Sequence, residues 1–237
     1  MAELLRVNSL NTGYEDMQIL WDVHLWMNQG ECVLVLGSNG AGKTTLLKTL
    51  VGLVDAWSGE VELAQQSLIK MSVDRRIHAG IGYLSETGTI PSLTVEDNLR
   101  LGGFYLSRTE RERRGNEMYE NFPILREKRK HLADSLSGGQ RKMLGAAKAL
   151  MSNPKLLIMD EPSAGLSPRL VTELIEILKG FHKQGLSLLI AEQNVKFLDI
   201  AERVYVLDSG RIGFAGTVKE LQADDAIRKA YFGVTGQ

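Results

Sequence analysis

The spacing of hydrophobic and polar residues predicts an alternation of buried strands and amphipathic helices. Continuous apolar runs at 32–36, 156–159 and 186–191 are typical of strands buried on both faces of a parallel sheet. Apolar residues at helical spacing follow two of these runs, at 46–53 and 170–181. This order of elements is typical of an α/β fold.

Shorter elements complete the expected fold. Further strands are predicted at 4–7, 23–27, 60–63 and 81–84, a hairpin at 204–207 and 211–215 around Asp208-Ser209-Gly210, a short helix at 73–78 and a helix at 224–231. Between Thr94 and His131 the chain is dense with charges of both signs, and Thr94 can cap a helix with Asp97. We therefore predict an inserted helical lobe, whose mixed charges are typical of a solvated helix surface.

Composition excludes several classes of function. The chain has 28 Lys and Arg against 29 Asp and Glu, so no excess positive charge favours nucleic acid. The single cysteine, Cys32, lies inside a predicted strand and reads as a small buried hydrophobe. Met1 to Asn8 contain an acid and polar breaks, unlike a secretory signal, and no apolar run approaches the ~20 residues that span a bilayer. Any connection to a membrane should therefore run through a partner protein.

A glycine-rich loop follows the strand at 32–36 and leads into the first predicted helix. It comprises Gly37, Ser38, Asn39, Gly40, Ala41, Gly42, Lys43, Thr44 and Thr45. The glycines let backbone N–H groups turn inward as an anion nest, Lys43 can bridge terminal phosphates, and Thr44 can ligate Mg²⁺. The strand, loop and helix therefore predict a nucleotide site. The loop alone does not distinguish a kinase, a GTPase, a helicase and a transporter.

Two further motifs are candidates for binding an anion and for catalysis. Ser137, Gly138, Gly139 and Gln140 form a second helix start whose bare N–H groups can bind an anion. The strand at 156–159 ends in Asp160, which can hold Mg²⁺, and Glu161, which can orient and deprotonate an attacking water. One chain thus carries two anion-binding helix starts, although one nucleotide does not need both.

Two isolated residues are further candidates for the site. Tyr14, in an expected early loop, is either a packing aromatic or a flat platform for an adenine ring. Glu86 carries a carboxylate in the polar loop after the strand at 81–84, where functional residues often lie.

Together these motifs resemble the ATP-binding subunit of an ABC transporter over essentially the whole chain. The resemblance implies an α/β P-loop NTPase (RecA-like) core, at 1–93 and 151–237, with an N-terminal antiparallel β-subdomain and an inserted helical subdomain at 94–150 that carries the signature motif. Its cofactors would be ATP and Mg²⁺. The glycine loop corresponds to Walker A, Leu136 to Gln140 to the signature, Asp160 and Glu161 to Walker B with the catalytic glutamate, and Ser163 to Ser167 to the D-loop.

The same resemblance gives Tyr14 the adenine-stacking position, Glu86 the Q-loop position near the metal and γ-phosphate, and Gln193 the switch position. Most relatives have Gln and His where this chain has Glu86 and Gln193, and both departures resemble the branched-chain amino-acid importer ATPases of the LivF type. The sequences Ala149 to Lys155 and Lys229 to Gly233 resemble that type too. Thr87-Gly88-Thr89 and Gln140-Arg141-Lys142 depart from it.

The resemblance also implies partners and location. Two ATPase subunits, identical or related, would close head to tail over two ATP molecules, each between one Walker A and the other chain's signature. Glu86 and the helical lobe would contact two integral membrane permease subunits at the cytoplasmic face of the inner or plasma membrane, with a periplasmic or lipoprotein solute-binding protein acting indirectly and no nucleic acid. Alternatives are an ATPase for a urea, amide or lipid transporter, and a soluble ABC protein without a transport role.

Overall fold

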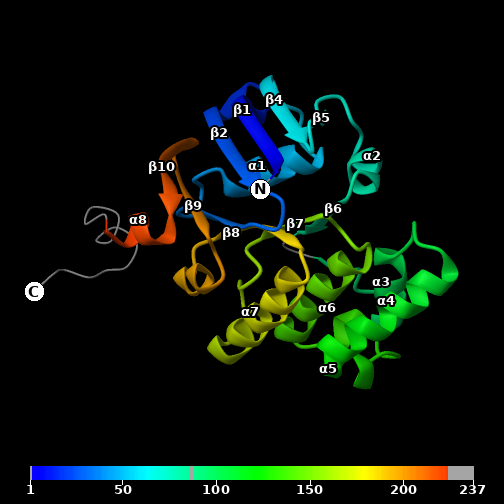
Figure 1. The fold of residues 1–237 in the computed structure, drawn as a ribbon. Coiled ribbons are helices and arrows are strands. Elements are labelled where there is room, and N and C mark those ends of the chain that lie inside the picture. The colour runs from blue at the N-terminus through cyan, green and yellow to red at the C-terminus, as the bar shows by residue number, and fades with distance from the viewer. Residues whose placement is uncertain (1, 86–87, 224–237) are drawn as a thin grey trace, which may run out of the picture. The chain divides into compact units, whose positions relative to one another are not determined.

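The computed structural model describes residues 2–85 and 88–223, shown in Figure 1. The chain divides into two compact units, residues 1–79 with 187–237 and residues 80–186. Glu86 and the helix predicted at 224–231 lie outside the described residues. Each unit is described separately below.

The first unit contains an antiparallel sheet with the order β2-β1-β4-β5. Its strands are β1 (Glu3–Tyr14), β2 (Met17–Asn28), β4 (Ser58–Leu63) and β5 (Gln66–Ser67). β1 and β2 are longer than the sequence predicted, and their pairing contains register shifts. Ser9 and Asp22 take positive φ angles of 48° and 50° at these irregularities. Such bulges interrupt the alternation of apolar and polar residues, which hides the continuity of a strand in the sequence.

A second group of strands in this unit carries the predicted glycine loop. β3 (Cys32–Leu36) pairs in parallel with β8 (Ser187–Glu192) and β9 (Arg203–Asp208), and β9 forms the predicted hairpin with β10 (Arg211–Thr217). All residues of β3 and β8 are buried, as the continuous apolar runs predicted. Burial raises the pKa of the Cys32 thiol well above its usual range, so this side chain stays a neutral hydrophobe.

Helix α1 (Lys43–Val51) begins directly after the glycine loop and lies beneath the antiparallel sheet in Figure 1. It contacts β1 and β2 as well as β8. Its last carbonyls, from Thr49 and Leu50, accept hydrogen bonds of 2.6 and 2.8 Å from the buried Arg76 guanidinium. Arg76 belongs to the short helix α2 (Val73–His78). A cation at a helix C-terminus stabilises the free carbonyls there.

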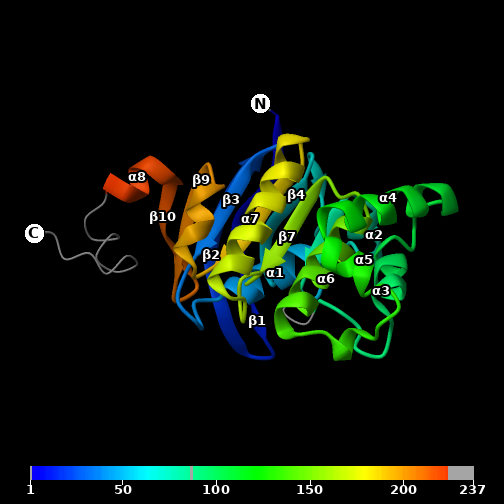
Figure 2. The ribbon, with the colours of Figure 1, turned by 90° about the horizontal axis from the view of Figure 1, so that it is seen from below.

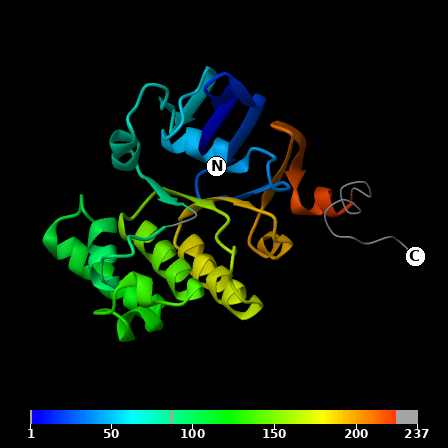
Figure 3. The same ribbon diagram turned by 180° about the vertical axis from the view of Figure 1, so that it is seen from behind.

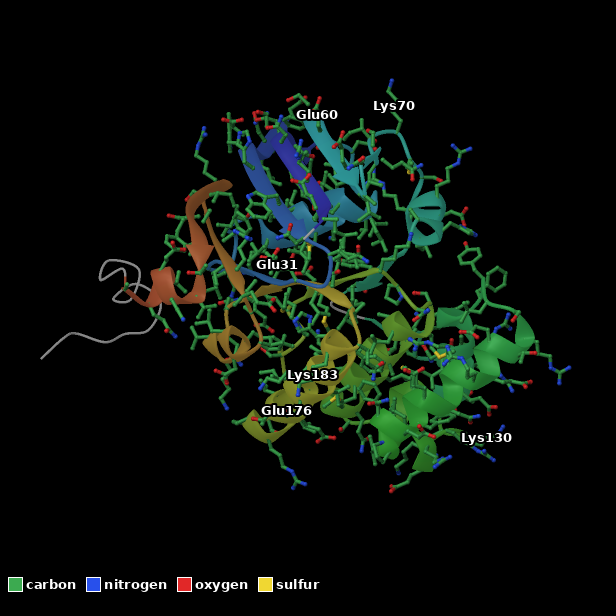
Figure 4. All side chains as sticks on the ribbon, viewed as in Figure 1. Glu31, Glu60, Lys70, Lys130, Glu176 and Lys183 are labelled. Atoms are coloured by element: carbon green, nitrogen blue, oxygen red, sulfur yellow. The ribbon has the colours of Figure 1, made fainter. Side chains whose placement is uncertain are left out.

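The described part of the first unit also contains two further short helices, η2 (Val195–Asp199) and α8 (Val218–Ala223). Figure 4 labels Glu31, which is buried, whereas Glu60 and Lys70 are exposed. The Glu31 carboxylate accepts hydrogen bonds from Arg203 Nε at 2.9 Å and from the Asn28 N–H at 2.7 Å. A buried charge with such partners avoids much of its desolvation cost.

The second unit is mainly helical. β6 (Ile81–Leu84) and β7 (Leu156–Asp160) pair in parallel. The helices are α3 (Val95–Gly102), α4 (Arg108–Asn121), α5 (Pro123–Glu127), η1 (Ala133–Ser135), α6 (Gly138–Met151) and α7 (Pro168–Lys183). Figures 2 and 3 show α3 to α6 gathered as one group, in agreement with the contacts of α6 with α3, α4 and α5.

Capping residues set the helix starts in the second unit, and Thr94 does so as predicted. The Thr94 hydroxyl accepts a hydrogen bond from the Asp97 N–H at 3.1 Å, and Ser167 caps α7 with Pro168 at its first position. α4 ends before Pro123, because proline starts a new helix but cannot continue one. Glu176, Lys183 and Lys130, labelled in Figure 4, are exposed, as expected for charges on solvated helix surfaces.

Candidate functional site

The glycine loop of the first unit encloses a lysine. Lys43 is buried, and its Nζ donates hydrogen bonds to the carbonyls of Gly37 at 2.9 Å and Ser38 at 3.1 Å. The loop can wrap around this ammonium because Gly40 and Gly42 take φ angles of 81° and 105°, which favour glycine. The arrangement places a positive charge at a glycine loop that precedes a helix start, which suits a phosphate.

Exposure differs along the loop and the start of α1. Ser38, Asn39, Gly40 and Thr44 are exposed, whereas Ala41, Gly42 and Thr45 are buried. Because Thr44 is exposed, a ligand can reach the hydroxyl that its predicted role requires. Thr45, also a predicted binding residue, lies on the packed face of α1.

Gln193 meets the glycine loop, as its predicted role requires. It follows the last residue of β8, and its Nε2 donates a hydrogen bond of 2.5 Å to Asn39 Oδ1. The backbone here is fixed by the buried Glu192 carboxylate, which accepts hydrogen bonds from the N–H groups of Gln193 at 3.0 Å and Asn194 at 3.1 Å. Two predicted site residues that lie 154 positions apart are thus brought together.

A third segment supports the loop from outside. Gly210, in the turn between β9 and β10, donates its N–H to the Ala41 carbonyl at 2.9 Å and accepts the Trp21 N–H at 2.9 Å. A Cβ on Gly210 would lie 1.9 Å from the Ile19 carbonyl oxygen, and a Cβ on Gly37 would lie 2.5 Å from that of Leu207. Sequence reasoning recognised this turn only as a hairpin, although its glycine was the available signal.

Tyr14 is the last residue of β1 and not part of a loop, which corrects the expected placement. Its side chain is 44% exposed, so its ring is accessible to a ligand. Its role as an adenine platform remains a prediction. Glu86, predicted to lie near the metal and the γ-phosphate, falls outside the described residues.

The second unit holds the predicted carboxylates. Asp160 is buried at the end of β7, and Glu161 follows it with a positive φ of 45°. This backbone conformation is costly for a residue with a Cβ and persists only where the surroundings hold it. The Glu161 carbonyl accepts hydrogen bonds from the Ala164 N–H at 3.1 Å and from Lys142 Nζ at 3.2 Å.

The predicted signature motif forms a rigid helix start. The Ser137 hydroxyl accepts the Gln140 N–H at 3.2 Å, and the Gln140 side chain accepts the Ser137 N–H at 3.1 Å. This reciprocal capping box fixes the start of α6. Ser137 and Gly138 are exposed, and a Cβ on Gly138 would meet nothing within 4 Å, so a ligand can approach here.

Comparison with known proteins identifies the family. The model of the ABC transporter family matches residues 20–164, more than half of the chain, so the chain belongs to this family. It is therefore an ATP-binding subunit, and an ATPase, of the ABC transporter type. The predicted family, P-loop NTPase fold and ATPase activity are thereby confirmed. Within the described residues, no helix is long and apolar enough to cross a bilayer.

Several relatives are similar along their whole length. The high-affinity branched-chain amino acid transport ATP-binding protein BraG of Pseudomonas aeruginosa is 37% identical, covering 97% of this chain and 100% of its own. The lipopolysaccharide export system ATP-binding protein LptB of Escherichia coli is 36% identical over 97% of each chain. The crystal structure of a nucleotide-free ATP-binding cassette from an ABC transporter superposes with a TM-score of 0.86 at 26% identity, covering 99% of this chain and 100% of the other.

Proposed function

We propose that two ATPase subunits bind ATP between them, and that hydrolysis drives the import of branched-chain or other hydrophobic amino acids through membrane permease subunits. The observation that supports ATP binding most directly is the buried Lys43 ammonium inside the glycine loop, with Gln193 at the loop residue Asn39. In this proposal Tyr14 stacks on the adenine, and the loop from Gly37 to Thr45 holds the phosphates.

The proposed catalytic step is metal-assisted attack of water on the γ-phosphate. The exposed Thr44 hydroxyl and the Asp160 carboxylate have the oxygen ligands that Mg²⁺ prefers, and the ion would neutralise phosphate charge. Glu161 is the proposed base for the attacking water, and Gln193 and Glu86 would contact the γ-phosphate or its water. The signature residues Ser137, Gly138, Gly139 and Gln140 would bind the γ-phosphate held by the other subunit.

The choice of solute rests on similarity. BraG and the probable branched-chain amino acid transport ATP-binding protein LivF of Archaeoglobus fulgidus are each 37% identical to this chain. LptB reaches 36% identity, so lipid export is the second candidate. The subunit would reach the cytoplasmic face of a membrane through its permease partners, and a periplasmic or lipoprotein solute-binding protein would deliver the substrate.

Variants of the catalytic glutamate and the loop lysine test the ATPase proposal. We expect Glu161→Gln to bind ATP, to lose at least about a hundredfold in turnover, and to form an ATP-dependent dimer by light scattering. Lys43→Ala should fail to dimerise with ATP. Wild-type turnover by Glu161→Gln would exclude Glu161 as the base, and an ATP-loaded Glu161→Gln that stays monomeric would contradict the composite site.

A pull-down from the native membrane tests the solute. The tagged subunit should bring down permease subunits, and the binding protein that accompanies them should bind leucine, isoleucine or valine by calorimetry. Recovery of permeases whose complex carries lipid and no amino-acid-binding protein would favour the lipid exporter instead. Recovery of no membrane protein would contradict both transport assignments.

A further inference from the structure

Two successive cations near the start of α6 donate hydrogen bonds to backbone carbonyls, one just before the signature motif and one directly after β7. Arg141 Nη1 donates hydrogen bonds to the carbonyls of Leu136 at 2.6 Å and Asp134 at 3.3 Å, just before Ser137. Lys142 Nζ donates to the carbonyl of Glu161 at 3.2 Å. All of these residues belong to the second unit, so the contacts lie within one compact body.

The residue that Lys142 contacts occupies an unfavourable backbone conformation. Glu161 has a φ of 45°, in the left-handed region that is unfavourable for a residue with a Cβ. Its carbonyl is held from two directions, by the Ala164 N–H and by the Lys142 ammonium. A hydrogen bond from a charged donor is stronger than one from a neutral donor. Lys142 therefore helps to fix the peptide that orients the Glu161 carboxylate.

Several hydrogen bonds hold the start of α6 in place. The capping box of Ser137 and Gln140 fixes its first turn, and Arg141 ties that turn to the preceding segment. Lys142 lies immediately after these residues and is half-buried. A shift of the signature residues toward a ligand would thus move the donor that holds the Glu161 carbonyl.

We propose that Lys142 is a positioning residue that couples the two ATP sites of the dimer. The inference rests on the composite sites proposed above. In that arrangement the signature of one chain serves the ATP held by its partner, whereas Glu161 serves the ATP held by its own chain. Lys142 joins these two parts within one chain. ATP bound at the partner's glycine loop would then act through Lys142 on the Glu161 turn. That turn serves the ATP held by its own chain.

Steady-state kinetics of Lys142 variants test the coupling. Lys142→Met keeps the aliphatic length but removes the donor, Lys142→Arg keeps a charged donor, and Lys179→Met is a matched control, since Lys179 Nζ donates only within α7, to Glu176 at 2.8 Å in the contacts described. We expect Lys142→Met to lower kcat about five- to tenfold with KM for ATP within about twofold. Its Hill coefficient should fall from above one toward one. Lys142→Arg should restore both values, and Lys179→Met should change neither.

A merely structural lysine would give a different result. If Lys142→Met lowered the unfolding temperature but left kcat and the Hill coefficient at wild-type values, the coupling would be wrong. Non-cooperative turnover by the wild type would also overturn it. If Lys142→Met does not fold, the same comparison is made with Lys142→Gln, which keeps a shorter neutral donor and should show the same direction of change.

The dimer assay separates this inference from the proposed function. In the Glu161→Gln background, Lys142→Met should still form the ATP-dependent dimer, because the exposed signature residues are intact. A dimer together with wild-type kinetics of Lys142→Met would refute only the role of Lys142. Failure of Glu161→Gln itself to dimerise with ATP would refute the composite site and, with it, the coupling.

Discussion

Two buried charges near the glycine loop, Lys43 and Glu192, have backbone hydrogen-bond partners. Lys43 donates to two loop carbonyls, and the buried Glu192 carboxylate accepts the N–H groups of the two residues that follow it. Burying a charge without partners is costly, so these contacts stabilise the loop as well as the side chains. They also fix where Gln193 points.

Gln193 should contribute hydrogen bonds without a titration of its own. A carboxamide stays neutral, whereas an imidazole in its place would change charge near its ordinary value of about pH 6.5. We expect Gln193→Ala to lower turnover about tenfold, the size of one lost charge-assisted hydrogen bond in the transition state. The ratio of wild-type to Gln193→Ala turnover should be independent of pH between about 5.5 and 8.

The matched variant is Gln193→His. The ratio of wild-type to Gln193→His turnover cancels the titration of ATP itself and should bend near pH 6.5. Unchanged turnover of Gln193→Ala would contradict a γ-phosphate contact. In that case the bond between Gln193 and Asn39 would serve only to order the loop.

At the scale of elements, the turn between β9 and β10 supports the glycine loop. Gly210 links the Ala41 carbonyl of the loop to the Trp21 N–H of β2 through its own backbone. Its φ is 77°, and it approaches the Ile19 carbonyl too closely for any side chain. The loop conformation therefore depends on packing against two strands as well as on its own glycines.

Gly210→Ala should damage nucleotide binding through this contact. The new Cβ must displace Ile19 or the turn, since it would lie 1.9 Å from the Ile19 oxygen. We expect the free energy of unfolding to fall by about 1–3 kcal/mol and the affinity for ATP to fall about tenfold. Denaturant unfolding and calorimetric titration with ATP measure the two effects.

Gly213→Ala provides the control in the same hairpin. Its nearest neighbour would be the Val206 carbonyl at 3.9 Å, an ordinary contact. Both ATP affinity and unfolding free energy should stay close to wild type. If Gly210→Ala bound ATP with wild-type affinity, the turn would not support the loop.

The elements that the sequence predicted well are those whose signals are local. Thr94 and Ser137 cap helices as predicted, and the apolar runs became fully buried strands. The full lengths of β1 and β2 were missed because bulges break their alternation. Local patterns do not encode contacts between distant segments, which explains why the support from Gly210 was missed.

The candidate site likewise combines features that the sequence predicted with features that it did not. The glycine loop, Asp160 and Glu161 were found from their sequence setting, and the meeting of Gln193 with Asn39 agrees with the role inferred from resemblance. The left-handed backbone of Glu161 and its contact with Lys142 were not foreseen. A single sequence does not show the φ angle of a residue. It also does not show which distant carbonyl a lysine side chain contacts.

At the scale of the whole molecule, the second unit presents an ordered aromatic loop to solvent. Phe104 and Tyr105, between α3 and α4, are 64% and 50% exposed, and their rings form an edge-to-face pair with centroids 5.3 Å apart. Arg111 holds the loop by hydrogen bonds to the carbonyls of Gly103, Phe104 and Leu106 at 3.0, 3.2 and 3.0 Å. An apolar pair that is both exposed and held in place is suited to a protein contact.

The neighbouring surface supports the same interpretation. A groove of about 720 Å³ between α3 and α4 is lined by Leu99, Arg100, Arg111, Tyr119 and Met151, among others. Arg111 thus both lines the groove and orders the aromatic loop. A helix with an apolar face from a membrane subunit would fit beside this loop, with Phe104 and Tyr105 as anchors. We expect the permease contact predicted for the helical lobe to include this loop.

Crosslinking in the assembled transporter tests this contact. Cysteines replacing Phe104 and Tyr105 should crosslink to a permease subunit, whereas cysteine at the exposed Lys183 of α7 should not. The existing Cys32 is buried and should not react.

Phe104→Ala should lower recovery of the permease complex by about tenfold or more, because truncating an anchor that becomes buried in the contact costs about 2 kcal/mol. The ATPase activity of the isolated subunit should be unchanged, since the loop lies outside the proposed catalytic residues. Crosslinks that form only from cysteines in β9, with none from residues 104 and 105, would place the permease contact on the first unit instead.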